Sequence, residues 1–226
     1  MLEVGPGIWA VRGGSFPSNS YICATVTSGE ALLVDVGLDP VPIETALQTL
    51  GLRPTHVFCT HGHFDHIGSA SVFQERYGTP VHLHPADVKI ARTNNFMLMA
   101  MKLEERIRLP ALTPTEDGAT FAFGQTTLRY RLTPGHTPGS CVIEWGSHLF
   151  TGDTLFAEGV GLSKLPGEDP TRLRESIRSL WDDLDRYTLL PGHGRGGAGT
   201  AIKRDNARLR AFIGQRSDAG TSPIHV

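Results

Sequence analysis

Three histidines and an aspartate fall within six consecutive positions of the sequence, in the stretch THGHFDH at residues 60–66. The chain has ten histidines in 226 residues, so this concentration calls for a chemical reason. Imidazole and carboxylate groups bind cations such as zinc at about 2.0–2.2 Å. Four such groups are too crowded for one tetrahedral ion, and they suit two neighbouring ions completed from other loops. The candidate ligands in this stretch are His61, His63, Asp65 and His66.

Three further residues could complete such sites. His136 lies in TPGHTPGS between turn signals, while Asp153 in FTGDTLF and His193 in LLPGHG directly follow expected strands. Loops that follow strands commonly present functional groups from a rigid sheet. A structural zinc site would instead favour cysteines at CxxC spacing, which this chain lacks.

The composition indicates a globular protein that handles small molecules. Hydrophobic residues make up 39%, charged residues 19%, and the net charge is -2. This balance gives no strong field to attract nucleic acid or an anionic membrane. No apolar run approaches the roughly 20 residues that span a bilayer, and the start of the chain lacks a signal-peptide pattern. Three widely separated cysteines favour buried thiols in a reducing compartment. We therefore expect a cytoplasmic protein with a small-molecule substrate and no nucleic-acid or membrane partner.

Strand-like and helical segments follow one another in an order that could position these groups. Strands are expected over IWAVRG, SYICATV, EALLVDVG, THVFCT and PVHLH, and later over TTLRYRL, CVIEW, HLFTGD and YTLLPGH. In TTLRYRL, apolar and polar residues alternate with the period of two that is typical of a half-buried strand. Helices are expected at about 43–50, 68–77, 86–109, 173–184 and 201–213. This order predicts two β-rich halves packed together with helices outside.

The segment 86–109 differs from its surroundings because it contains Met97, Met99 and Met101 within five positions. Methionine commonly fills gaps in cores, so a core helix is one interpretation. The alternative is an adaptable wall over a ligand pocket. The sequence alone leaves both open.

Through THGHFDH, TPGHTPGS, GDTLF and PGHG, in this order, the sequence resembles the metallo-β-lactamase superfamily. More narrowly, it resembles the glyoxalase II-type (hydroxyacylglutathione hydrolase-like) enzymes. The resemblance covers nearly the whole chain. It implies an α/β fold of the αββα type, in which two mixed β-sheets are flanked by helices and the site lies at one edge of the sheets. It also implies a single domain over residues 1–226, with a helical insertion at about 86–109.

The resemblance further implies two divalent metal ions, with zinc expected and iron or manganese as alternatives. It assigns His61, His63 and His136 to one ion, Asp65, His66 and His193 to the other, and Asp153 to both. Asp65 and Asp153 are the expected catalytic residues, because they would orient a metal-bridging hydroxide. Asp35 matches an aspartate that holds the loop or a ligand imidazole. The alternative for Asp35 is a turn residue at the end of a strand.

The expected reaction is hydrolysis of a thioester or an activated ester. A thiolate leaves without prior protonation more readily than an amine does, since a thiol has a pKa of about 8.5. One alternative is a persulfide dioxygenase with one iron on His61, His136 and Asp153. A lactonase of the same superfamily and a non-catalytic metal-binding domain are further alternatives.

Two features differ from the glyoxalase II pattern. Residues 194–226 leave room for one helix and a tail, where two-domain glyoxalase II enzymes carry a helical domain that helps to bind glutathione. We therefore expect weak use of glutathione thioesters. In addition, Lys164 stands where compact relatives commonly have an aspartate. We expect Lys164 to meet a substrate carboxylate as a point charge, and the alternative is a solvated loop charge.

Overall fold

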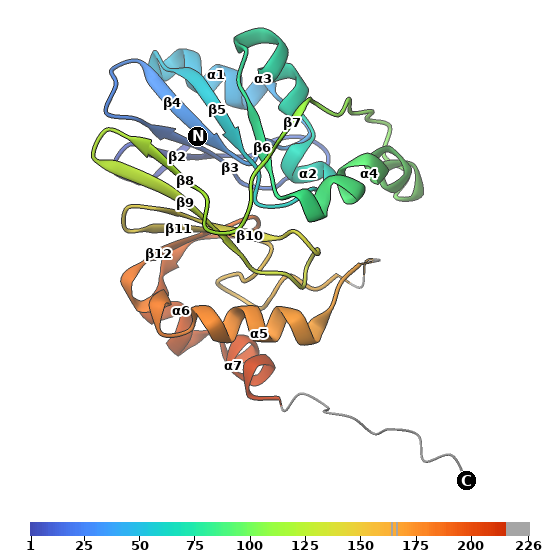
Figure 1. Cartoon of the computed structure of the whole chain (residues 1–226), viewed down its shortest axis with the longest axis vertical. Helices are drawn as coiled ribbons and strands as arrows, with labels where there is room; N and C mark the ends of the chain where they lie inside the picture. Colours follow the sequence, from blue (N-terminus) through green and yellow to red (C-terminus); the bar gives the residue numbers. More distant parts are fainter. Residues whose placement is uncertain (164, 166, 216–226) are drawn as a thin grey trace.

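Two β-sheets lie face to face, and helices cover their outer faces (Figure 1). This arrangement is seen in a computed structural model, which describes residues 1–163, 165 and 167–215. The predicted αββα sandwich of two mixed sheets is confirmed.

The first sheet contains the strands of the N-terminal part of the chain in sequence order. Neighbouring strands are antiparallel from the first to the fourth and parallel from the fourth to the seventh. The parallel strands all point their carboxyl ends toward one edge, where the candidate residues follow. Its strands are β1 (Leu2–Gly5), β2 (Ile8–Val11), β3 (Ser20–Ala24), β4 (Glu30–Val34), β5 (Arg53–Phe58), β6 (Val81–Leu83) and β7 (Leu112–Pro114).

The second sheet contains β8 (Thr120–Phe123), β9 (Thr126–Leu132), β10 (Cys141–Trp145), β11 (His148–Gly152), β12 (Thr188–Pro191) and β13 (Gly197–Ala198). Their spatial order is also the order of the sequence. Only the pair β11 and β12 is parallel among these strands, so this sheet is mixed as well.

The helices begin and end where local sequence signals allow. The first, α1, has Pro42 in its first turn and ends at Gly51, whose φ of 65° is left-handed. The fifth, α5, begins at Asp169, which accepts hydrogen bonds from the amides of Thr171 and Arg172. The helices are α1 (Val41–Leu50), α2 (Phe64–Ile67), α3 (Ala70–Tyr77), α4 (Val88–Ala100), α5 (Pro170–Leu180), α6 (Gly199–Asp205) and α7 (Ala207–Gly214), with 3-10 turns η1 (Pro85–Asp87) and η2 (Asp183–Arg186).

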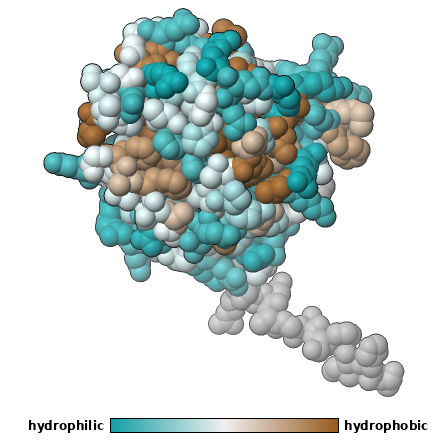
Figure 2. Space-filling model, turned by 45° about the horizontal axis from the view of Figure 1, so that its top comes forward, coloured by the Kyte–Doolittle hydropathy of each residue, from teal (hydrophilic) through white to brown (hydrophobic). Residues whose placement is uncertain are grey.

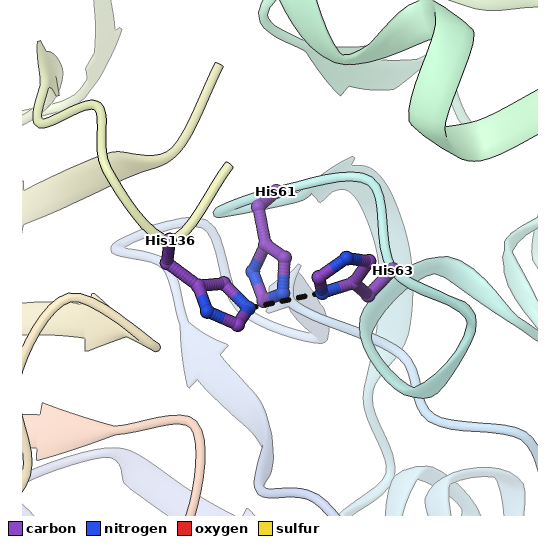
Figure 3. Close-up of side chains that lie close together, drawn as sticks. All are labelled: His61, His63 and His136. Carbon is purple, nitrogen blue, oxygen red and sulfur yellow. Dashed lines mark hydrogen bonds between the residues drawn. The ribbon is translucent and has the colours of Figure 1, made fainter. Parts of the chain in front are cut away.

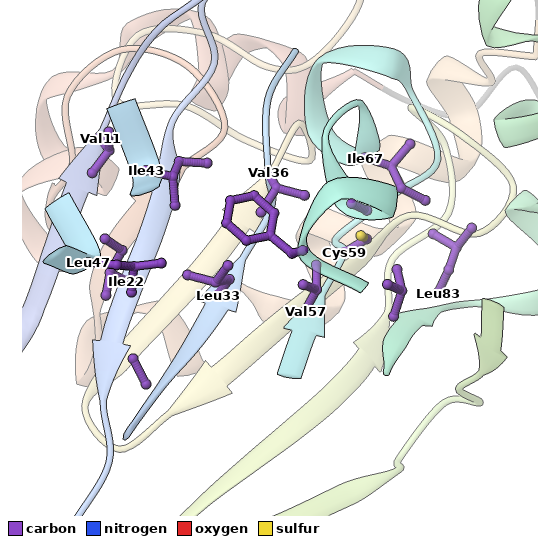
Figure 4. Packing of buried hydrophobic residues seen from close by; sticks show 14 of the residues in the cluster. Val11, Ile22, Leu33, Val36, Ile43, Leu47, Val57, Cys59, Ile67 and Leu83 are labelled. Carbon is purple, nitrogen blue, oxygen red and sulfur yellow. The ribbon is translucent and has the colours of Figure 1, made fainter. Parts of the chain in front are cut away.

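Three apolar clusters hold the layers together. One lies between α1, α3 and the first sheet (Figure 4), one lies between the two sheets, and one lies between the second sheet and α5 to α7. Strand β4 shows the alternation that produces this layering. Leu32 and Val34 join the cluster between the sheets, whereas Ala31 and Leu33 join the cluster under the helices.

Two sequence predictions about helices need correction. The helix expected through residue 109 ends at Ala100, because Lys102 adopts a φ of 60° and the following segment turns back. The side chain of Asn95 holds that segment by bonding both the amide and the carbonyl of Ile107. The final helix is broken at Asn206, whose side chain accepts from the amide of Leu209 and starts α7.

The surface has mixed hydropathy, and the cysteines are buried as the sequence predicted. On the face in Figure 2, hydrophilic residues predominate and hydrophobic residues form separate areas. Cys23, Cys59 and Cys141 are buried and unpaired with one another, as expected. In the described part of the chain, no helix has the length and apolar character needed to cross a membrane.

Candidate metal centre

The motif THGHFDH follows the end of β5, in a loop that runs directly into the single turn of α2. His61 and His63 belong to the loop, and Asp65 and His66 belong to α2. All four side chains are buried. The second sheet supplies the other candidates from loops, with His136 before β10, Asp153 after β11 and His193 after β12. The structure thus brings the seven predicted residues together at one edge of the sandwich.

The residues His61, His63 and His136, here called the first trio, converge on one point (Figure 3). One ring nitrogen from each lies within 4.8 Å of the others, and Nδ1 of His63 is 2.9 Å from Nε2 of His136. Burial, together with neighbouring imidazoles, lowers the pKa of His61 well below its usual range and that of His63 to about 4. Both rings are therefore neutral at pH 7 and offer lone pairs to a cation.

The residues Asp65, His66 and His193, here called the second trio, form a neighbouring cluster with the same spacing limit. Nε2 of His193 lies 3.1 Å from Oδ2 of Asp65, and Nε2 of His66 lies 3.3 Å from the same oxygen. Burial opposes ionisation of Asp65, but attraction to His66 and hydrogen bonding by His193 outweigh it and hold the pKa of Asp65 far below its ordinary value. Burial likewise opposes protonation of His193, but Asp153 and Asp65 raise its pKa to about 9.

Asp153 lies between the two trios. Its Oδ1 is 3.4 Å from Nε2 of His66, and its Oδ2 is 3.6 Å from Nε2 of His136 and 3.4 Å from Nε2 of His193. One carboxylate therefore faces rings from both clusters. This is the position that the sequence resemblance implies for a bridging residue.

The donor atoms in this region fit a pair of divalent cations. Among the described residues, three buried atoms in this region, His61 Nε2, His66 Nε2 and Asp153 Oδ1, lack a hydrogen bond of good geometry, although the last two face each other as an ion pair at 3.4 Å. An unsatisfied buried polar atom costs roughly 1–3 kcal/mol, so three at one place need a common explanation. Cations coordinated by nitrogen and carboxylate oxygen provide one. That these residues bind metal remains a prediction, which the geometry favours.

Asp35 makes both contacts that the sequence suggested for it. Its Oδ1 accepts from the amide of Thr60 at 2.7 Å, and its Oδ2 accepts from the Thr60 hydroxyl at 2.8 Å and from Nδ1 of His66 at 2.9 Å. Because the Thr60 hydroxyl donates to Asp35, its oxygen accepts from Nδ1 of His61 at 3.1 Å. Both rings are therefore held through Nδ1 and turn Nε2 toward the centre.

Backbone carbonyls orient two rings from the second sheet in the same way. Nδ1 of His136 donates to the carbonyl of Gly161 at 3.0 Å, and Nδ1 of His193 donates to the carbonyl of Pro17 at 3.3 Å. Each ring then presents Nε2 to Asp153. Fixing the far nitrogen of a histidine in this manner is typical of metal ligands.

A cavity of about 420 Å³ opens over the two trios. Met97 and Met101 of the predicted methionine wall line it, whereas Met99 points away and is 57% exposed. The wall interpretation therefore holds for two of the three methionines. The remaining lining residues are Phe16, His63, Phe64, Asp65, His136, Asp153, Phe156, Ser163, Leu165 and His193. A larger cavity of about 660 Å³ lies elsewhere, along Arg12 and Arg195, and contains none of the seven candidates.

Other histidines lie away from the centre, and one predicted substrate-binding residue lies outside the described residues. His82 stacks on Phe58 in the core between the sheets, and His84 binds the backbone at the start of η1. His56 stacks beside His82. Lys164 lies outside the described residues, so its expected role in substrate binding remains a prediction.

The sequence reasoning missed three residues near the centre. Phe16 and Phe156 line the cavity, and Asp87 is fully buried beside the loops of the first trio. Phe156 could have been found from its place in GDTLF, three positions after Asp153. Asp87 ends the 3-10 turn η1 shortly after β6, and this position after a strand was the available signal.

Comparison with known proteins agrees with this geometry. Residues 13–193 match the model of the metallo-beta-lactamase superfamily, and this range includes all seven candidates. The chain belongs to the metallo-β-lactamase superfamily. In this superfamily member, the seven candidate residues lie together at one edge of the two sheets.

Individual relatives extend the comparison. A hydroxyacylglutathione hydrolase of Anaeromyxobacter dehalogenans is 32% identical over 205 residues, covering 88% of this chain and 72% of that protein. A probable polyketide biosynthesis zinc-dependent hydrolase of Bacillus velezensis, BaeB, is 30% identical over 177 residues, covering 78% of this chain and 72% of that protein. The crystal structure of TTHA1623 in a di-iron-bound form superposes with a TM-score of 0.80 at 31% identity, covering 88% of this chain and 98% of that one.

Proposed function

We propose that this protein is a metal-dependent hydrolase that cleaves a thioester or an activated ester at a pair of divalent ions. The observation that carries the proposal is the position of Asp153, whose carboxylate faces rings of both trios. Relatives named as a hydroxyacylglutathione hydrolase and a zinc-dependent hydrolase support it. Zinc is the expected metal, and the di-iron form of TTHA1623 keeps iron as an alternative.

The first trio would hold one ion, the second trio the other, and Asp153 both. Such a pair supplies Lewis acidity toward a carbonyl oxygen and a nucleophilic water at neutral pH. The protein contributes ligand rings whose far nitrogens are already fixed, for example by Asp35 and Gly161. This preorganisation removes the cost of ordering the ligands when the ions bind.

Asp65 and Asp153 are the proposed catalytic residues. Both line the cavity, and attraction to His66 keeps each carboxylate ionised against the opposing effect of burial. An ionised carboxylate in this position can accept a hydrogen bond from the attacking water and orient it toward a carbonyl carbon. It can also accept the proton that the water loses.

The lining of the cavity favours a leaving group that needs no protonation. Apart from the seven candidates, its described lining residues are Phe16, Phe64, Met97, Met101, Phe156, Ser163 and Leu165, and none of these is an acid in the neutral pH range. A thiolate can leave without a proton because the pKa of a thiol is about 8.5. The proposed substrate is therefore a thioester rather than an amide.

The same lining suggests an apolar portion of the substrate. Phe16, Phe64 and Phe156 line the cavity, and Met97 of α4 with Met101 at its C-terminal cap adds flexible apolar surface. Burial of an apolar acyl or thiol chain there would contribute about 0.8 kcal/mol for each buried methylene. We propose a substrate with such a chain.

The test is a substrate panel on protein purified without added metal. Thioesters of increasing acyl length, a lactone, an activated ester and an amide would be compared, with and without a chelator, while oxygen uptake is followed on a persulfide. Chelator-sensitive thioester hydrolysis that improves with acyl length is expected. Oxygen uptake on the persulfide, with one iron for each chain, would instead indicate the mononuclear dioxygenase.

A further inference from the structure

Asp87 occupies the N-cap of α4 but does not cap the helix. An aspartate at an N-cap ordinarily accepts from amides of the first turn. Asp169 does so for α5 at 3.0 Å, whereas the side chain of Asp87 makes no such bond. Asp87 has 0% exposed surface, so its carboxylate is committed to other buried partners.

Those partners are the two loops that carry the first trio. Oδ2 of Asp87 accepts from the amide of Gly62 at 2.8 Å and from the hydroxyl of Thr137 at 2.7 Å. Oδ1 accepts from the amide of Gly139 at 2.6 Å. One carboxylate thus receives three hydrogen bonds, and they come from segments that are more than 70 positions apart in the chain.

The two glycines allow this close approach. A Cβ on Gly62 would come within 2.9 Å of the carbonyl oxygen of Asp87, and a Cβ on Gly139 would come within 2.7 Å of its Oδ1. Any larger residue at either position would push its loop away from Asp87. Asn94, about two helical turns further into α4, donates to the carbonyl of Gly62 at 2.9 Å. Both polar groups at Gly62 are therefore held from α4 and its cap.

The sequence positions of these contacts concern one trio only. Gly62 lies between His61 and His63, and Thr137 directly follows His136. Asp87 therefore bonds to residues that are directly adjacent in sequence to every member of the first trio. Asp87 itself does not line the cavity. Asp35, in contrast, is shared between the trios, because it binds His66 directly and reaches His61 through Thr60.

We propose that Asp87 is a positioning residue. It holds the two loops of the first trio in a fixed position relative to each other and so determines the affinity for one ion of the pair. This inference rests on the proposed function, since it requires the first trio to hold a metal ion. Asp87 does not touch the ion or the substrate. Its effect passes through the backbone at Gly62 and through Thr137, which set where the three rings stand.

The experiment uses the full chain with Asp87→Asn, a substitution of nearly equal size. Asparagine offers one acceptor oxygen and places an amide donor against the remaining donors. Metal-free wild type and variant would be titrated with zinc in competition with a chromophoric chelator. We expect one of the two affinities to fall by about 10–100-fold, the usual effect of removing such a support, and the other to stay within a few-fold of wild type. Anomalous scattering from crystals at one zinc per chain should then show occupancy of the second trio.

Three further variants make the result specific. Asp169→Asn is the matched control, because asparagine caps a helix as well as aspartate does, and both zinc affinities should be unchanged. Asp35→Asn should weaken the binding of both ions, because Asp35 binds His66 directly and supports His61 through Thr60. If Asp87→Asn does not fold, Thr137→Val removes one of the three bonds and should weaken the same ion by a smaller factor.

The outcomes separate this inference from the proposed function. Wild-type protein that binds two zinc ions, with Asp87→Asn or Thr137→Val showing unchanged affinities, would overturn the role of Asp87 alone. Equal weakening of both ions in these variants would do the same, since it would indicate general loosening of the site. Wild-type protein that binds no ion would overturn the proposed function and the inference together.

Discussion

Oδ2 of Asp35 lies 2.9 Å from Nδ1 of His66, and both side chains are buried. Asp35 adopts a φ of 54°, a left-handed conformation that residues with a Cβ seldom use. Such backbone strain persists where the surroundings fix it, and it commonly occurs beside functional groups. Here this conformation places the Asp35 carboxylate, just after β4, within hydrogen-bonding distance of both Thr60 and His66.

Replacing Asp35 by asparagine should lower kcat/KM by about 10–100-fold without unfolding the protein. Asparagine tolerates the left-handed conformation, so the backbone is kept, while the charge and one of the two acceptor oxygens are lost. His66 would then lack the partner that fixes its Nδ1 proton. The measurement is steady-state kinetics with circular dichroism, and Asp117→Asn is the control because its carboxylate accepts from the amide of Leu132 away from the centre. Kinetics equal to those of wild type would show that Asp35 is only a turn residue.

Asp153→Ala should reduce turnover by at least about 100-fold and leave the fold largely intact. The variant removes the one carboxylate that faces rings of both trios, so the binding of both ions should be disturbed. Turnover would be measured together with metal content and far-ultraviolet circular dichroism. Near wild-type turnover at full metal content would show that the bridging role is misassigned.

Met97→Ala should raise KM for a thioester with a long apolar chain by about 2–10-fold and change KM for a short one less. Met97 lines the cavity, and its truncation removes apolar contact that is uniform to ground and transition states. Met99→Ala is a matched control on the same helix, because Met99 points into solvent. Similar kinetics for the two variants would mean that the substrate does not reach this wall.

The metal-free protein should lose stability between pH 7 and pH 5, partly through His82. Burial, and to a lesser degree nearby His56, lowers the pKa of His82 from 6.5 to about 4. In this pH range the unfolded chain takes up a proton at His82 that the folded chain does not, so acid favours unfolding. His82→Phe keeps the stacking on Phe58 and should remove about 1–2 kcal/mol of this loss. Urea unfolding at both pH values measures it, and equal losses in wild type and variant would show that His82 does not contribute.

The sequence predicted the sandwich and the position of the seven candidates because both depend on local patterns. The alternation of apolar and polar residues along β9 predicted one buried face. THGHFDH predicted a cluster of metal ligands directly after a strand. Asp35 could also be predicted from the sequence, since it ends the expected strand EALLVDVG. The methionine wall could be suspected but not oriented, because the burial of Met97 and the exposure of Met99 depend on how α4 packs.

Features that depend on contacts across the chain were not predicted. The helix expected to residue 109 stops at Ala100 because Asn95 binds Ile107 and draws the following segment back. The role of Asp87 requires two glycine-containing loops to meet around one carboxylate, which no local pattern reveals. Its sequence context predicts only a helix start after Pro85.

The most direct test of the account is a zinc titration of the metal-free protein in which thiol release from an apolar acyl thioester is measured at each addition. The account predicts that activity rises until about two zinc ions per chain are bound and then stays constant, because both trios must be filled around Asp153. A plateau at one ion per chain, or no thiol release at any zinc concentration, would contradict it.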